Sequence, residues 1–325
     1  MSEGLKALIL EDCEDDRYLL ERALRKAGLD IASTWVDCRG AFIAALEGSR
    51  PDVILADCNL PDIDGAGALE IAARMHPAAP VVLVTGGLSD DDAAELLRAG
   101  AQDYVLKDRL ARLGPAVMAA IERAGAQARQ LADAARLKEA FYATIQAITR
   151  TMEKRDPYTA GHQERVAELA EAIGREMGLP TDRLEGLRVG AHIHDIGKVY
   201  VPSEILNRPG RLSPTEFALI QAHPEIGHDI VKDVDFPWPV ARMILEHHER
   251  MDGSGYPRGL KGDAILLEAR VIGVADVFEA MTSHRPYRPA LGRTAALAEI
   301  SARRGTHFDP LAVDAFLRVA GRGDA

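Results

Sequence analysis

Residues 4–122 alternate short apolar runs with longer stretches in which apolar residues recur every three or four positions. The runs predict buried strands, and the periodic stretches predict amphipathic helices packed beside them. The predicted strands are residues 5–10, 31–36, 52–56, 81–84 and 104–106, and the predicted helices are residues 17–27, 39–47, 65–75 and 90–99. This alternation predicts an α/β fold, a doubly wound parallel sheet of five strands with helices on both faces.

A single helical pattern follows from Pro115, rich in Ala, Arg, Gln, Glu and Leu, and proline suits the first turn of a helix. A weak heptad seam runs through Val117, Ile121, Ala124, Ala128, Leu131 and Ala135. Two interpretations stay open for this connector. The helix packs on its own domains, or it forms a homodimer as a coiled coil, which so many alanines would leave marginal.

Long helical patterns dominate residues 141–325, and no alternating strand pattern competes with them. They predict an all-α domain whose polar motifs gather at helix ends. The motifs are RDPYTAGH at 155–162, HIHDIGK at 192–198, HHERMDGSGYP at 247–257, VADVFEAMTSHRPYR at 274–288 and GTHFDP at 305–310. We therefore expect an α/β domain at 1–122, a helical connector at 123–145 and an all-α domain at 146–325.

Composition supports a two-domain protein of the cytoplasm. At roughly 100–200 residues per domain, 325 residues predict two domains. No apolar run reaches the ~18–20 residues that span a bilayer, and the N-terminus turns acidic where a signal peptide needs its cleavage region. The three cysteines, an odd number without a CxxC pair, fit a reducing compartment.

The net charge of −11 disfavours a protein that coats nucleic acid, and neither end carries a helix-turn-helix pattern or a basic patch. The surplus is uneven along the chain. Residues 1–122 hold 22 acidic and 12 basic side chains, whereas residues 123–325 hold 28 and 27. The second part is therefore nearly neutral, and its charge does not oppose a small phosphate-bearing ligand.

Polar residues stand at the carboxyl ends of the predicted strands, where parallel sheets bind ligands. They are Glu11 and Asp12 after the first strand, Asp57 after the third, Thr85 after the fourth and Lys107 after the fifth. Helix capping explains any one of them, but not all five together. Clustered carboxylates repel unless a cation joins them, and Mg²⁺ prefers oxygen ligands. Asp57 could then attack a phosphoryl donor while Thr85 and Lys107 hold the phosphoryl oxygens.

This segment resembles the receiver domain of two-component response regulators, a CheY-like domain with a flavodoxin-like fold. The resemblance implies that a sensor histidine kinase donates a phosphoryl group to Asp57. It also implies that Mg²⁺ is held by Glu11, Asp12 and Asp57, and that the switch residues are Thr85, Tyr104 and Lys107.

Histidine marks the second part, which holds nine of the ten. His194 precedes Asp195 directly, and His247 precedes His248. Adjacent imidazoles in an apolar helix are costly without partners, and they point about 100° apart, so they can serve two metals. Three more candidate ligands are His162, His223 and Asp276. Five imidazoles and two carboxylates can complete two six-coordinate ions with a bridging carboxylate, and this ligand set suits Fe, Mn or Zn.

The second part resembles the HD-GYP family of HD-domain phosphohydrolases. The resemblance implies metal binding by His162, His194, Asp195, His223, His247, His248 and Asp276. It implies that Lys198 faces the scissile phosphate and that the substrate is held by Tyr256, Arg285 and Arg288. The implied substrate is cyclic di-GMP, cut to pGpG and in some members on to GMP. Tyr158 stands where some members carry a Glu that binds a third metal, so we expect two metals, most simply Fe or Mn.

Two other functions stay open. The site could hydrolyse another cyclic dinucleotide or phosphoester. The chain could instead be a non-catalytic module that binds partner proteins under the control of phosphorylation, although such a module has no need of seven metal ligands. The other histidines beyond residue 160 are expected in structural or surface roles: His192, His228, His284 and His307.

Overall fold

The computed structural model describes residues 4–87, 89–154, 161–208, 210, 212–283 and 290–322. The chain divides into two compact units, residues 1–137 and 138–325, each described here by itself. Arg285, Arg288 and Tyr158 lie outside the described residues.

The first unit is built on a parallel sheet, as the alternating pattern predicts. Its strands are β1 (Leu5–Leu10), β2 (Ile31–Val36), β3 (Val53–Asp57), β4 (Val81–Thr85) and β5 (Asp103–Leu106). Their order is β2-β1-β3-β4-β5, and each neighbouring pair is parallel. This is the doubly wound order in which chain direction across the sheet reverses between β1 and β3, and ligands bind at that reversal.

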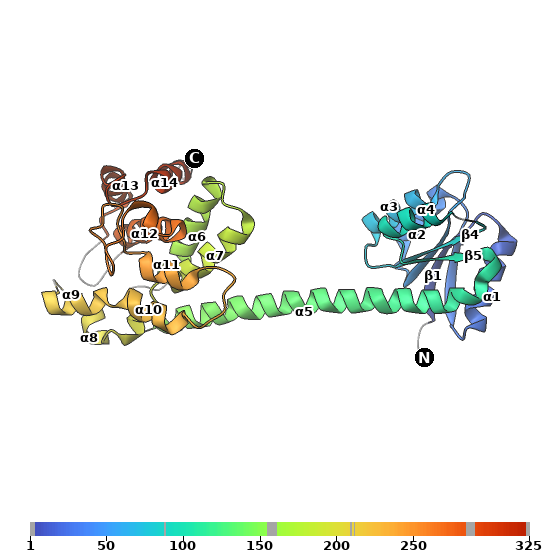
Figure 1. Cartoon of the computed structure of the whole chain (residues 1–325), viewed down its shortest axis with the longest axis horizontal. Coiled ribbons are helices and arrows are strands. Elements are labelled where there is room, and N and C mark those ends of the chain that lie inside the picture. Colours follow the sequence, from blue (N-terminus) through green and yellow to red (C-terminus); the bar gives the residue numbers. More distant parts are fainter. Residues whose placement is uncertain are drawn as a thin grey trace. The chain divides into compact units, whose positions relative to one another are not determined.

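Helices cover both faces of this sheet (Figure 1). They are α1 (Glu14–Lys26), α2 (Arg39–Gly48), α3 (Gly65–Met75), α4 (Asp90–Arg98), the 3₁₀ turn η1 (Lys107–Arg112) and α5 (Leu113–Glu153). Side chains along a strand point to alternate faces. Leu8 and Leu10 of β1 accordingly pack with α2 and α3, whereas Ala7 and Ile9 pack with α1 and the start of α5. The apolar runs are therefore buried on both sides.

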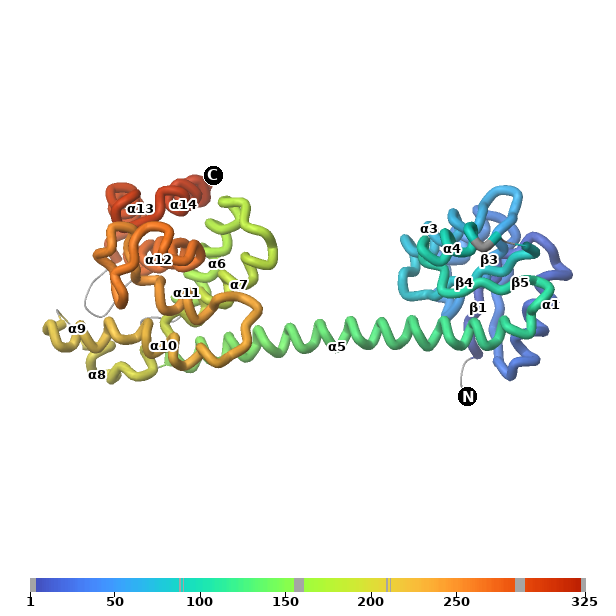
Figure 2. Tube along the Cα trace, viewed as in Figure 1, coloured from blue at the N-terminus to red at the C-terminus, as the bar shows by residue number. Residues whose placement is uncertain are grey.

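The connector is one unbroken helix, α5, of 41 residues (Figure 2). It begins at Leu113, two residues earlier than the prediction from Pro115, and ends at Glu153. Val117 is fully buried in the first unit, whereas Leu131 keeps 66% of its surface exposed and Leu137 keeps 74%. Towards its end, Ile145 is buried again within the second unit.

Among its described residues, the regular elements of the second unit are all helices, apart from one isolated bridge between Arg304 and Phe308. Its elements are α6 (His162–Glu176), α7 (Thr181–Ile193), η3 (Ile196–Tyr200), α8 (Ser203–Leu206), α9 (Pro214–Gln221), α10 (His223–Val231), α11 (Val240–Glu246), η4 (Gly262–Ala264), α12 (Leu267–Thr282), α13 (Arg293–Ala302) and α14 (Pro310–Arg322). Apolar side chains of α6, α7, α12 and α14 form its main core. Within the described ranges, no helix is both long and apolar enough to cross a bilayer.

Candidate functional site

The site in the second unit is assembled at helix ends. His162 is the first residue of α6, and His194 follows the last residue of α7. His223 opens α10, and His247 follows the last residue of α11. Asp276 comes from the buried middle of α12. Because α6, α7, α11 and α12 share one core, these ends are held close together although their residues are far apart in sequence.

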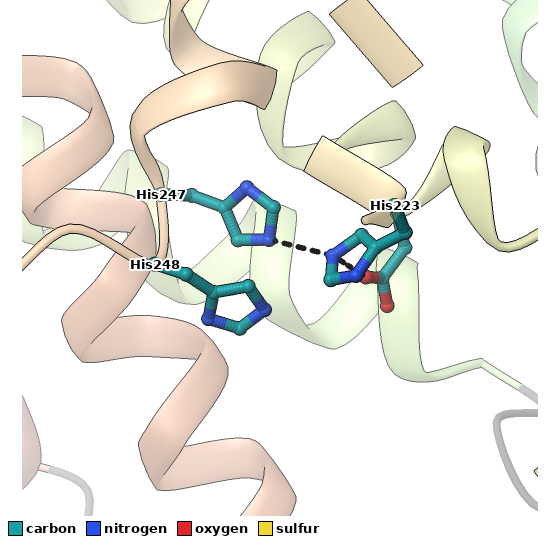
Figure 3. Close-up of side chains that lie close together, drawn as sticks. His223, His247 and His248 are labelled. Atoms are coloured by element: carbon teal, nitrogen blue, oxygen red, sulfur yellow. Dashed lines mark hydrogen bonds and ion pairs between the residues drawn. The ribbon is translucent and has the colours of Figure 1, made fainter. Parts of the chain in front are cut away.

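Four predicted ligands form one cluster, in which one ligand atom from each lies within 4.8 Å of the others. They are Asp195, His223, His247 and His248. Asp195 Oδ1 lies 3.2 Å from His223 Nε2, and the Nε2 atoms of His223 and His247 are 3.3 Å apart (Figure 3). The ring centroids of His247 and His248 are 4.1 Å apart.

The other three predicted ligands, His162, His194 and Asp276, form a second cluster of the same tightness. Asp276 Oδ1 lies 3.3 Å from His162 Nε2 and 3.9 Å from His194 Nε2. Asp195 belongs to the first cluster, yet its Oδ2 lies 3.5 Å from His194 Nε2. One carboxylate therefore faces both groups of histidines, which is the geometry of a bridging ligand.

Burial and charge hold His247, His248 and Asp195 in the states that bind metal. Burial lowers the pKa of His247 and of His248 well below the usual value, and neighbouring imidazoles lower it further. Although burial opposes ionisation of Asp195, the charge of Lys198 and the hydrogen bond with His223 keep its pKa well below the usual range. Neutral imidazoles and ionised carboxylates are the forms that coordinate cations.

The donor set fits divalent cations. His194, His223 and His247 each place Nδ1 within 2.6–2.7 Å of a backbone carbonyl three residues earlier, which leaves Nε2 for another partner. Among the described residues, the buried Nε2 atoms of His162 and His194 have no hydrogen-bond partner. Buried nitrogens without partners are costly, and a shared cation is the partner that this arrangement suits.

Two polar side chains converge on the shared carboxylate. Lys198 Nζ lies 2.6 Å from Asp195 Oδ2, and Gln163 donates to the same oxygen over 3.3 Å. Lys198 is in the 3₁₀ turn η3, one turn after Asp195, so its ammonium can reach the Asp195 carboxylate. Gln163 was not predicted, because a glutamine after a histidine carries no distinctive pattern.

The GYP motif lies beside the first cluster. The Tyr256 ring faces the His248 ring at a centroid distance of 4.8 Å, and burial raises the pKa of its hydroxyl. The loop is closed by Glu249, which the sequence analysis missed. Its buried carboxylate accepts hydrogen bonds from the backbone N–H groups of Arg258 and Leu260 over 2.7 and 2.9 Å. Of the predicted substrate contacts, Arg285 and Arg288 lie outside the described residues.

The first unit gathers its predicted residues at the carboxyl ends of β1 and β3. Glu11, Asp12 and Asp57 each place an oxygen within 4.8 Å of the others. Lys107 Nζ lies 2.8 Å from both Asp57 and Glu11, and 2.5 Å from Asp16, which was not predicted. Burial raises the pKa of Glu11.

Two of the predicted switch residues lie on the strands beside this cluster, Thr85 on β4 and Tyr104 on β5. Thr85 is buried and its hydroxyl donates to the Gly87 carbonyl over 3.0 Å, while Tyr104 is half-buried on β5. Although burial opposes the charge of Lys107, hydrogen bonds to three carboxylates raise its pKa. The Lys107 ammonium thus lies against the clustered carboxylates, and the oxygen donors of Glu11, Asp12 and Asp57 fit Mg²⁺.

Comparison with known proteins decides the family. The model of the response regulator receiver domain matches residues 7–117, and that of the HD domain matches residues 146–311. The Cyclic di-GMP phosphodiesterase response regulator RpfG of Xanthomonas campestris pv. campestris is 33% identical, over 97% of this chain and 88% of that protein. The chain belongs to the response regulators that carry an HD domain. The two units are thus a receiver domain and an HD domain, and such domains bind Mg²⁺ and divalent metal ions respectively.

Two further relatives differ in how much they share with this response regulator. A Cyclic di-GMP phosphodiesterase of Thermotoga maritima is 30% identical, over 97% of this chain and 90% of that protein. The 3'3'-cGAMP-specific phosphodiesterase 3 of Vibrio cholerae is 40% identical, over 51% of this chain and 36% of that protein. The HD-domain relatives therefore include enzymes named for different cyclic dinucleotides.

Proposed function

We propose that this response regulator hydrolyses cyclic di-GMP, with either pGpG or GMP as the product, under the control of phosphorylation at Asp57. One observation carries the proposal. All seven candidate ligands lie in two adjoining clusters that meet at Asp195. They do so in a chain that matches cyclic di-GMP phosphodiesterases over nearly its whole length.

We assign the candidate ligands to two metals. His162, His194 and Asp276 would hold one, His223, His247 and His248 would hold the other, and Asp195 would bridge them. Imidazole with carboxylate favours Fe or Mn. When bound, such a pair supplies an activated bridging water and a clamp on the phosphate under in-line attack.

The protein's own side chains would orient the substrate and stabilise charge. Lys198 already points its ammonium at the shared carboxylate, so it is placed to neutralise the negative charge that develops on the phosphoryl oxygens. Tyr256 packs beside His248, and its buried hydroxyl would position the substrate. Arg285 and Arg288 would contact the second phosphate or a guanine edge, since a guanidinium binds both in pairs of hydrogen bonds.

The receiver would supply control. Asp57 would accept a phosphoryl group from a sensor histidine kinase, with Mg²⁺ held by Glu11, Asp12 and Asp57. Thr85, Tyr104 and Lys107 would respond to the new charge. We propose functional boundaries of 1–122 for the receiver, 123–145 for the connector and 146–325 for the hydrolase. The exposure of Leu131, which lies on the heptad seam of α5, supports a homodimer through this helix, which light scattering would test.

Anaerobic purification followed by metal analysis and a cyclic di-GMP turnover assay tests the proposal. We expect Fe or Mn at two per HD domain, and turnover that His194→Ala abolishes. His228→Ala is the matched control, because His228 is partly exposed and its ion-pair partner is Asp229, outside both clusters. Metal-replete protein that leaves cyclic di-GMP intact would refute the proposed function.

A second candidate function is hydrolysis of 3'3'-cGAMP, favoured by the 40% identity to a phosphodiesterase named for that substrate. The two ligand clusters would hold metals that act on a phosphodiester, and they offer no group that would distinguish one base from another. Relative kcat/KM values for cyclic di-GMP, 3'3'-cGAMP and cyclic di-AMP would decide between the two candidates. A cellular effect that persists in His194→Ala would instead favour the non-catalytic binding module.

A further inference from the structure

His162 is oriented differently from three of the other candidate ligands. His194, His223 and His247 each direct Nδ1 to a backbone carbonyl three residues earlier. The partner in each of these contacts is a backbone atom, so replacing the side chain of the partner residue leaves that atom in the chain. His162 begins α6, so no turn of that helix precedes it. Its Nδ1 instead meets the carboxylate of Glu279, which lies 117 residues later in the chain.

Glu279 is itself held firmly in place. It lies on α12 one turn after Asp276 and keeps only 5% of its surface exposed. Its Oε2 meets His162, while its Oε1 accepts hydrogen bonds from Arg165 Nε over 2.8 Å and from Ser283 Oγ over 2.7 Å. A carboxylate with three partners has little freedom to rotate, so it can fix the ring that it contacts.

Asp276 and Glu279 contact opposite nitrogens of the same imidazole. Glu279 lies at Nδ1, and Asp276 Oδ1 lies 3.3 Å from Nε2. With the Nδ1 proton directed to Glu279, the lone pair of Nε2 faces Asp276 and the second cluster. A metal-binding histidine usually donates its other N–H to a carboxylate or carbonyl in this way, and loss of that partner typically costs ~10–100-fold in metal affinity or activity.

We propose that Glu279 is a positioning residue for the metal site, which orients His162 and fixes the tautomer in which Nε2 binds the cation. The proposal rests on the proposed function and deepens it. It assigns a role to a carboxylate outside the seven candidate ligands. Ser283 also donates a hydrogen bond to Glu279, and it directly precedes the segment that carries Arg285 and Arg288, the proposed substrate contacts. Glu279 therefore contacts both His162 and the residue before that segment.

The test is Glu279→Gln in the full-length protein, with Glu268→Gln as the matched control. Glu268 lies on the same helix, is equally buried at 3% exposed, and pairs with Arg183 at 2.6 Å instead of with a histidine. Metal-free protein is titrated with Mn²⁺ in excess Mg²⁺, which fills the carboxylate site of the receiver, and free Mn²⁺ is followed by electron paramagnetic resonance. Thermal unfolding and cyclic di-GMP turnover are measured on the same samples.

We expect Glu279→Gln to weaken one of the two Mn²⁺ sites by ~10–100-fold, with turnover recovering as Mn²⁺ is raised. Glu268→Gln should keep the affinity of the wild type. Unchanged affinity in Glu279→Gln, or equal weakening in both variants, would overturn the proposal. If Glu279→Gln does not fold, Glu279→Asp tests the same contact, because the shorter side chain withdraws the carboxylate from His162 Nδ1. Unchanged Mn²⁺ affinity in Glu279→Asp would also overturn the proposal.

The two proposals can fail separately. Wild-type protein that binds Mn²⁺ but leaves cyclic di-GMP intact would refute the proposed function, while the affinity ratio between Glu279→Gln and wild type would still support the positioning role. Wild-type protein that binds neither Mn²⁺ nor Fe²⁺ in the HD domain would overturn both.

Discussion

The Thr149 hydroxyl on α5 donates a hydrogen bond to the backbone carbonyl of His192 on α7, over 3.1 Å in a buried position. His192 is two residues before His194. The same stretch of α5 places Ile145 in one apolar cluster with Val189 and Ile193 of α7. The end of α5 is therefore part of the packing that holds His194 and Asp195, and Thr149 makes a buried polar contact there.

Thr149→Val should weaken the response of the hydrolase to phosphorylation. Valine keeps the shape of threonine but leaves the His192 carbonyl without this donor. We expect this loss to lower the free energy of unfolding by about 1–3 kcal/mol. Thr144→Val is the control, since the exposed Thr144 hydroxyl bonds Ala140 within its own helix over 2.8 Å. We expect kcat of Thr149→Val to change less than that of wild type when beryllofluoride mimics phosphorylation of Asp57. A full response in Thr149→Val would contradict this coupling.

Lys198→Met should lower kcat by ~10²–10³-fold with little change in bound metal. The ammonium lies 2.6 Å from Asp195 Oδ2, but it is not a metal ligand, and methionine keeps most of its apolar stem. Lys232→Met serves as control, because Lys232 pairs with Asp229 on an exposed part of α10. Steady-state kinetics with metal analysis separate the roles. A rise in KM alone would mean that Lys198 binds substrate and transition state equally.

The metal-free protein should lose stability between pH 7 and 9. Burial opposes protonation of His162, but the carboxylates of Asp276 and Glu279 raise its pKa to about 9 from 6.5. A group whose pKa is higher in the folded than in the unfolded protein stabilises the fold fully at a pH below its unfolded pKa. This contribution disappears as the pH rises through its folded pKa. Burial lowers the pKa of His194 and of His247, so their contributions change on the acid side, below 6.5.

Urea unfolding at pH 7, 8 and 9 measures this effect. Added Mn²⁺ should reverse the loss, because the metal binds the deprotonated imidazole. Glu279→Gln should flatten the pH profile, because it removes one of the two carboxylates that favour the charged ring. A metal-free wild type with constant stability from pH 7 to 9 would contradict the assignment of His162.

The sequence was sufficient to predict the sheet and the seven candidate ligands. Continuous apolar runs such as residues 53–56 have few other uses than a buried strand, and the structure places all four of those residues in β3. Adjacent histidines are equally distinctive and indicate a metal site, although the structure places His247 and His248 after the end of α11 and in one cluster, where the sequence analysis allowed them to serve two metals. The complete set of seven candidate ligands came from the resemblance to the HD-GYP family. Polar residue types that are costly to bury can be recognised as candidate site residues when they occur in apolar segments.

The residues that the sequence analysis missed depend on tertiary contacts. Glu279 is one acidic residue among many on helices, and its role is visible only once α6 lies against α12. Thr149 looks like Thr144 in sequence, yet only Thr149 reaches another helix. The start of α5 at Leu113 also depends on a tertiary contact. A Cβ on Gly114 would lie 2.2 Å from the Cβ of Ala27, so the first turn of α5 packs closely against the end of α1.

Gly197→Ala should disrupt the metal site by displacing backbone. Gly197 lies between Asp195 and Lys198, where η3 approaches α10. A Cβ there would meet the His223 carbonyl oxygen at 1.9 Å and the Gly227 nitrogen at 2.6 Å, and neither backbone atom can move alone. Relief of this overlap must push η3 away from α10, which separates Asp195 from His223, now 3.2 Å apart.

We expect Gly197→Ala to lose at least about 1–3 kcal/mol of unfolding free energy, together with Mn²⁺ affinity. Gly125→Ala is the control, because the nearest atom to its added Cβ is Arg129 Nη1 at 3.6 Å. Alanine in place of a helical glycine should stabilise α5 by roughly 0.5–1 kcal/mol. Urea unfolding and Mn²⁺ titration measure both variants. Wild-type stability in Gly197→Ala would show that η3 and α10 are not packed as closely as this geometry requires, because a methyl group would then fit between them.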